Sequence, residues 1–191
     1  MLAEFLKAFM AIFVIMDALG NIPIFNGLNK SFSEQQKKKN ITLAVIIAGI
    51  VLVIFLFLGN QLLNFFGIRI SSFKIAGGIV LLILGIEVTL GIKFKKDKTE
   101  TKDLAVVPMG TPLLTGPGVI TTVLILVGSY GYWITLAAGI ANLAVAFILL
   151  RLSEPFLKVF GKQGAEVFSR IMGLIIVAIA VEFVRQGWAA I

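Results

Sequence analysis

The sequence contains no cysteine and no histidine, and only 14% of its 191 residues are charged. Without these two residue types the chain has no disulfides, thiolate nucleophiles, imidazole bases or soft-metal ligands. An aspartyl dyad would need two adjacent acids, and Asp97 and Asp103 lie in a lysine-rich stretch far from Asp17. We therefore expect no enzyme activity, no catalytic residues, no bound metal and no cofactor.

What the sequence has in excess is apolar side chains, which make up 59% of the chain against about 45–50% in a soluble domain. A membrane-spanning helix needs roughly 20 apolar residues. Six apolar runs of suitable length lie at approximately 3–28, 41–60, 72–92, 104–128, 132–151 and 166–188. Little chain remains for anything else, so we predict an all-α polytopic membrane protein with a single transmembrane domain over 1–191.

The basic residues are distributed unequally between the two sides of these six spans. Both termini fall on one side, together with Lys7, Arg69, Lys74 and Arg185, and the rest of the 17 basic residues fall on the other. Loops rich in Lys and Arg stay cytoplasmic, so we expect both termini outside. The same cations contact anionic lipid headgroups, and they lack the interleaved aromatics of a nucleic-acid surface.

The two halves of the chain match each other. An offset of 94 residues places Leu63, Phe66 and Gly67 on Leu157, Phe160 and Gly161, and one inserted residue then places Glu87 on Glu182. Because each half has three spans, an odd number, the second half must be inverted relative to the first. We predict two inverted-topology three-helix repeats, about 1–94 and 104–191, joined by the lysine-rich cytoplasmic connection 93–103.

Gly and Pro interrupt the first and fourth spans at corresponding positions, within 17–23 and 111–118. Pro removes a backbone donor and Gly permits turns that other residues resist. We predict that both helices are discontinuous there, with the second half of the first span beginning after Gly20. Unpaired backbone at membrane depth is tolerated where it is buried in protein or lines a cavity, and paired interruptions of this kind are typical of a transporter's binding site.

Half-helix ends present N–H groups to an anion and carbonyls to a cation, so a zwitterionic amino acid suits both. The glycines leave little side-chain volume, which favours a small, uncharged substrate. The candidate substrate-binding residues are Gly20, Asn21, Ile22, Pro23, Thr111, Leu114, Thr115, Gly116, Pro117, Gly118, Thr121 and Thr122.

Three acids lie within the spans and are the candidates for ion coupling: Asp17, Glu87 and Glu182. A carboxyl group is expensive at membrane depth, which favours a role for each. The alternative for Asp17 is to cap the half-helix that follows the break. The alternative for the two glutamates is to pair with Lys93 or Arg185.

The stretches 17–25 (DALGNIPIF) and 112–122 (PLLTGPGVITT) resemble the paired motifs of the MarC/SnatA family of membrane proteins, and the resemblance covers essentially the full chain. One departure is Ala18, where the family often has Pro. The resemblance implies transport of small neutral amino acids such as glycine and alanine, driven by an ion gradient, with the proton as the expected ion and sodium as the alternative.

We therefore expect a secondary active transporter of the plasma (inner) membrane that works by alternating access. The alternative is a channel or facilitator for a small neutral solute, because inverted six-span folds with half-helices also form pores. Neither break carries an Asn-Pro-Ala signature.

Overall fold

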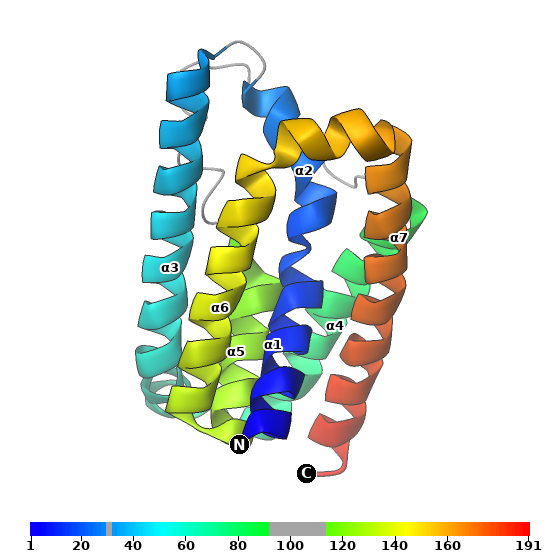
Figure 1. Ribbon diagram of the computed structural model, residues 1–191. Coiled ribbons are helices and arrows are strands. Elements are labelled where there is room, and N and C mark those ends of the chain that lie inside the picture. The colour runs from blue at the N-terminus through cyan, green and yellow to red at the C-terminus, as the bar shows by residue number, and fades with distance from the viewer. Residues whose placement is uncertain (30–31, 92–113) are drawn as a thin grey trace.

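The chain forms a helical bundle with both termini at the same end (Figure 1). A computed structural model describes residues 1–29, 32–91 and 114–191, which contain helices and turns and no strand. In these ranges the helices are α1 (Leu2–Met16), α2 (Ala18–Asn29), α3 (Glu34–Phe65), α4 (Ile70–Leu90), α5 (Pro117–Tyr130), α6 (Tyr132–Arg151) and α7 (Ser153–Trp188). The predicted all-α class is confirmed.

Four segments in the described ranges are long and apolar enough to cross a membrane: α3, α4, α6 and the stretch Gln163–Trp188 of α7. They correspond to the second, third, fifth and sixth predicted spans. Only 22–39% of the residues in their apolar windows are buried, so most of these side chains face outward. Such an exterior would be unfavourable in water and suits hydrocarbon.

The helix α5 lies at the centre of the bundle. Its residues Gly118, Val119 and 121–127 are buried, and it contacts α1, α3, α4 and α6. A helix that is apolar all round is expected to be buried on every side. In the first turn of α5, Gly118 and Val119 are buried, whereas Pro117 is exposed.

The first predicted span is two helices, but the break is earlier than the sequence led us to expect. Asp17 adopts a left-handed conformation with φ 41° and ends α1. The second half, α2, then starts at Ala18 and not after Gly20, and Pro23 lies inside it. Pro23 removes one hydrogen bond without ending the helix, because its fixed φ of about −65° is itself helical.

Neither half of the first span is long enough to cross alone. The 15 residues of α1 and the 12 residues of α2 rise about 22 and 18 Å at 1.5 Å per residue. The hydrocarbon core is roughly 30 Å thick. The chain therefore crosses only if both helices contribute, and Figure 1 shows α2 continuing α1 toward the other end of the bundle.

In the fourth span, α5 begins at Pro117 with Gly116 as its N-cap residue, within the predicted break at 111–118. Proline at the first helical position is favourable because its missing N–H would have no partner in the helix. The first half of this span, Thr111 and the connection 93–103 lie outside the described residues.

Two glycines at equivalent positions of the predicted repeat have the same unusual backbone. Gly67 ends the α3–α4 turn with φ 67°, and Gly161 kinks α7 with φ 69°. A Cβ would meet no atom within 4 Å at either site, so glycine is required by the left-handed conformation and not by space. After the kink, α7 turns from the end of the bundle into its last span (Figure 1).

The helices α4 and α7 approach each other backbone to backbone. A Cβ on Gly78 would lie 2.8 Å from the carbonyl oxygen of Ala180, and one on Gly173 would lie 3.1 Å from that of Gly85. Small residues that permit such contact are typical of helix pairs in membranes. The close-contact role expected from the sequence for Gly78 and Gly173 agrees with these distances.

We predict that Gly78→Ala destabilises the protein, because the new methyl group would force the two backbones apart. The loss should be about 1–3 kcal/mol, the usual cost of overpacking. Thermal unfolding in detergent checks this against Gly128→Ala, a helical glycine of α5 whose Cβ would meet no atom within 4 Å. An equal effect of the two substitutions would contradict the prediction.

Candidate functional site

Asp17 joins three helices at the break in the first span. The Gly20 N–H donates to its Oδ1 at 3.1 Å, and the Ser169 hydroxyl of α7 donates to its Oδ2 at 2.9 Å. The Asp17 carboxylate thus caps the start of α2. A negative charge is stabilised there by the positive end of the helix dipole. The capping role left open for Asp17 is present, and a coupling role stays a prediction.

Asn21 and Gly20 hold the break in its observed shape. The Asn21 side-chain amide donates to the carbonyl oxygen of Met16 at 3.1 Å, which supplies a partner for a backbone group at the end of α1. A Cβ on Gly20 would collide with the carboxylate of Asp17 and the hydroxyl of Ser169. Gly20 is therefore required for close approach, and not to end the helix.

The N-terminus of α5 is built differently from that of α2. Gly116 has no side-chain cap hydrogen bond, and Pro117, which is exposed, has no N–H. The next donors, Gly118 and Val119, belong to buried residues, and no side-chain carboxylate of the described residues caps this helix start. Backbone N–H groups in this arrangement are suited to bind an anion.

The two interruptions lie next to each other. A Cβ on Gly118 would be 3.1 Å from the Ile15 side chain, in the last turn of α1, and 2.8 Å from Leu81 of α4. Leu114 and Val119 share one buried cluster with Met16, Ala18 and Ile22. The structure thus brings together most residues of the two predicted motifs.

The threonines of the second motif are bonded to backbone. Thr115 is buried and donates to the carbonyl oxygen of Ala48 in α3 at 3.0 Å, and Thr122 donates to that of Gly118 at 2.8 Å. Thr121 packs its methyl group on Gly77 of α4. Thr115 therefore fixes the segment before α5 to α3, whereas the other two threonines act within helix packing.

Ile22 and Pro23 lie within α2, away from either helix end. Ile22 is fully buried in the apolar cluster, and Pro23 has no N–H. Because α2 begins at Ala18, neither residue lies at the start of a helix.

Glu182 does not lie at the break. It pairs with Arg185 at 2.6 Å and accepts from Gln186 at 2.8 Å, which is the alternative that the sequence offered for it. It is 13 positions after Ser169, about 20 Å along α7. Glu87 is half-buried in α4, two positions before Thr89, whose backbone N a Cβ on Gly173 of α7 would meet at 2.7 Å. Lys93, its suggested partner, lies outside the described residues.

Sequence reasoning missed Ser169 and Asn142. Ser169 is a small polar residue beside Arg170, a position where a hydroxyl at the membrane interface is unremarkable. Asn142 is a lone amide in the middle of the fifth predicted span. A polar residue at membrane depth is a functional candidate by default, so this residue could have been singled out from the sequence. Asn142 donates to the carbonyl oxygens of Phe9 and Ala138.

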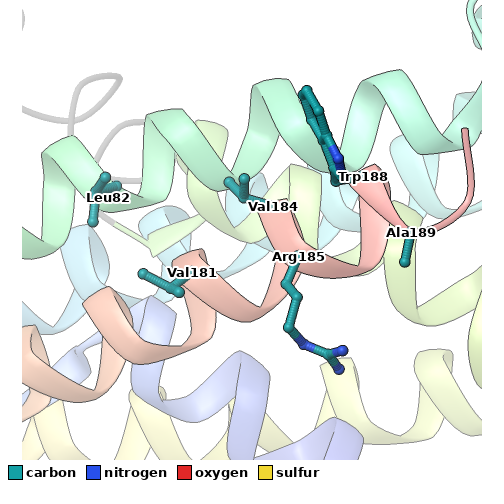
Figure 2. A pocket seen from close by; sticks show the side chains of 6 residues that line it. All are labelled: Leu82, Val181, Val184, Arg185, Trp188 and Ala189. Carbon is teal, nitrogen blue, oxygen red and sulfur yellow. The ribbon is translucent and has the colours of Figure 1, made fainter.

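A hollow of about 470 Å³ lies elsewhere, between α4 and α7 near the C-terminus (Figure 2). Its lining is apolar apart from Arg185, whose guanidinium extends away from Val184 and Trp188 (Figure 2) and is paired with Glu182. Its walls include side chains on the exposed apolar exterior, such as Val181. A zwitterion would find no acceptors and donors there, so this hollow suits a lipid chain.

The other end of the bundle is held by polar contacts. Lys37 of α3 lies between Glu34, at 2.6 Å, and Glu154 at the start of α7, at 2.8 Å. The ammonium group of Lys37 holds the pKa of Glu154 below its ordinary value. Beneath this pair, Asn40 donates to the buried side chain of Asn29 at 2.8 Å. These bonds close the end of the bundle that carries most of the basic residues.

Comparison with known proteins shows to which family the chain belongs. Residues 2–191 match the family described as MarC family integral membrane protein. The chain belongs to the MarC family. The resemblance drawn from the two motifs is therefore confirmed, and the protein is an integral membrane protein.

Similar MarC proteins occur in both archaea and bacteria. One from Archaeoglobus fulgidus is 37% identical, over 98% of this chain and 93% of the relative. One from Buchnera aphidicola is 34% identical over 96% and 90%, and one from Aquifex aeolicus is 32% identical over 96% and 91%. All three are named UPF0056 membrane protein, which states no substrate. No solved structure matches the chain.

We predict that Asp17→Asn leaves the free energy of unfolding within about 0.5 kcal/mol of the wild type, because Asn caps helices as well as Asp does and tolerates the left-handed region. Asp17→Val should lower it by about 2–4 kcal/mol, since it removes the cap and strains a β-branched residue. Thermal unfolding of both variants is the measurement. A similar loss in both would show that the cap and the backbone conformation at Asp17 do not determine stability.

Proposed function

We propose that this MarC protein is a secondary active transporter of small neutral amino acids, such as glycine and alanine, that works by alternating access. The observation that carries the proposal is the contrast between two adjacent helix starts. The start of α2 is capped by Asp17, whereas the start of α5, whose first N–H donors Gly118 and Val119 are buried, has no side-chain cap. A substrate carboxylate would accept hydrogen bonds from the start of α5, as the Asp17 carboxylate does from the start of α2.

The proposed fold is a six-span inverted repeat, with one half at about 1–94 and the other at about 104–191. Two contacts between α4 and α7 support it. At an offset of 95 residues, Gly78 corresponds to Gly173 and Gly85 corresponds to Ala180. The contact between Gly78 and Ala180 therefore corresponds to the contact between Gly173 and Gly85. The matching left-handed glycines 67 and 161 support the same symmetry.

A small substrate is favoured by the packing around the break. Gly20 and Gly118 are positions where even one added carbon would meet neighbouring side chains, so these glycines expose their own backbone where no larger residue would fit. A backbone surface supplies N–H and carbonyl groups without filling space. Discrimination would follow from the lack of room for a large side chain.

Asp17 is our candidate for the proton carrier. It is the residue at which the first span breaks, and both of its oxygens accept hydrogen bonds, from α2 and from α7. Protonation would change the acceptor strength of this carboxyl group and so alter the contact between the first span and α7. Such a group supplies the two-state element that coupling requires.

Transport in liposomes tests the proposal. We predict saturable exchange of glycine by the wild type, with substrate-driven proton uptake that Asp17→Asn abolishes. Thr115→Val should weaken exchange about tenfold, because it removes the hydrogen bond that fixes the segment before α5 to α3. The matched control is Thr135→Val, which removes a hydroxyl bonded within α6. Flux that rises linearly with glycine concentration would instead indicate a channel, and proton coupling that survives Asp17→Asn would exclude this carboxyl group.

The orientation proposed from the basic residues places both termini outside the plasma membrane. Because the chain has no cysteine, single cysteines can report it without background. We predict that an impermeant maleimide modifies Ala190→Cys in intact cells, whereas Lys158→Cys reacts only after permeabilisation. Both positions are exposed in the fold. The reverse pattern would invert the assigned orientation.

A further inference from the structure

Asn142 has an amide whose orientation is fixed by its neighbours. It lies in the middle of α6 and only 1% of it is exposed. Its Nδ2 donates to the carbonyl oxygen of Ala138 at 2.8 Å and to that of Phe9, in α1, at 3.1 Å. Both amide protons are therefore used, and a flipped amide would place its oxygen against two carbonyl oxygens. The oxygen Oδ1 must point elsewhere.

That oxygen has no protein donor. Among the described residues, Oδ1 of Asn142 is the single fully buried side-chain polar atom that lacks a hydrogen-bond partner. Buried acceptors without donors are rare in folded proteins and unfavourable. An unpaired acceptor with a fixed direction is, in contrast, well prepared for a ligand that brings its own donor.

Asn142 lies level with the start of the second motif. The next residue, Leu143, is the side chain that a Cβ on Gly49 of α3 would contact, at 3.3 Å. Gly49 follows Ala48, whose carbonyl oxygen accepts the hydrogen bond from Thr115. Leu143, the neighbour of Asn142 in α6, thus packs beside the turn of α3 to which the segment before α5 is bonded. Leu114, Ala48 and Leu143 also share one buried cluster.

We propose that Asn142 is a substrate-binding residue whose Oδ1 accepts a hydrogen bond from the ammonium group of the transported amino acid. This inference rests on the proposed function and adds a residue that the two motifs do not contain. An ammonium group offers three donors and no acceptor, so it fits an acceptor that has no donor of its own. The carboxylate of the same molecule would take the N–H groups of the α5 start.

A neutral acceptor also suits a net-neutral substrate. The amide adds no charge to the apolar surroundings of α1, α3 and α6, whereas a buried carboxylate there would be costly without a permanent partner. In the described conformation α1 packs over Asn142 through the bond to Phe9. Because Oδ1 is buried in this conformation, the ammonium group would reach it in another conformation of the transport cycle, one that opens the Oδ1 side of the amide and keeps the bond to Phe9.

The test compares glycine with glycolate, which carries a hydroxyl group in place of the ammonium group, as competitors of labelled glycine exchange in liposomes. The main variant is Asn142→Thr. Its hydroxyl can donate to the Ala138 carbonyl, as Thr122 does to Gly118. The hydroxyl oxygen lies closer to the helix than Oδ1, so the variant withdraws the acceptor from its position, whereas Asn142→Leu removes the acceptor altogether. We expect the preference for glycine over glycolate to fall about tenfold or more, the worth of a hydrogen bond to a charged group. Asn142→Leu should give the same loss.

Asn40→Leu is the matched control, because Asn40 is an equally buried amide whose Oδ1 is bonded to Gln36. It should leave the preference unchanged. An unchanged preference in Asn142→Thr, or equal weakening for both competitors, would overturn the inference and assign Asn142 to helix packing. Absence of glycine transport in the wild type would overturn the proposed function and this inference together, so the two failures are distinguishable.

Discussion

The carboxylate of Asp17 is the interaction on which the rest of the structure depends. A helix that ends inside a membrane protein leaves carbonyl and N–H groups that water cannot satisfy. Asp17 ends α1, caps α2 and accepts a hydrogen bond from α7, while Asn21 supplies a donor for a carbonyl of α1. Two neighbouring polar side chains thus make an interrupted span tolerable.

The break in the first span matters because it lies beside the start of α5. Its last apolar turn packs on the first turn of α5, and α5 is surrounded by other helices. A helix start in that place has its positive end in a low dielectric environment, where an opposite charge is attracted more strongly than at the surface. The contrast between a capped and an uncapped start gives the proposed transport function its physical basis.

The sequence predicted the class of the fold because apolar length alone identifies α3, α4, α6 and the last stretch of α7. It predicted that the first span breaks, but placed the start of α2 too late, since a proline near a helix start can lie within the helix and Asp17 ends α1 sooner. Ser169 and Asn142 could not be assigned, because their roles depend on contacts with residues 152 and 133 positions away, which periodicity does not contain.

The contact between α4 and α7 has a mechanical consequence. Where two backbones touch through glycine, no side chain can change rotamer to absorb a shift, and separation loses many weak contacts at once. These two helices would therefore move as one rigid body. A change of shape must then be taken up at joints elsewhere, among them those that carry the left-handed residues Asp17 and Gly161. Both joints adjoin segments that reach Asp17 itself, so the stiffest and the most adaptable parts of the molecule meet at a single carboxyl group.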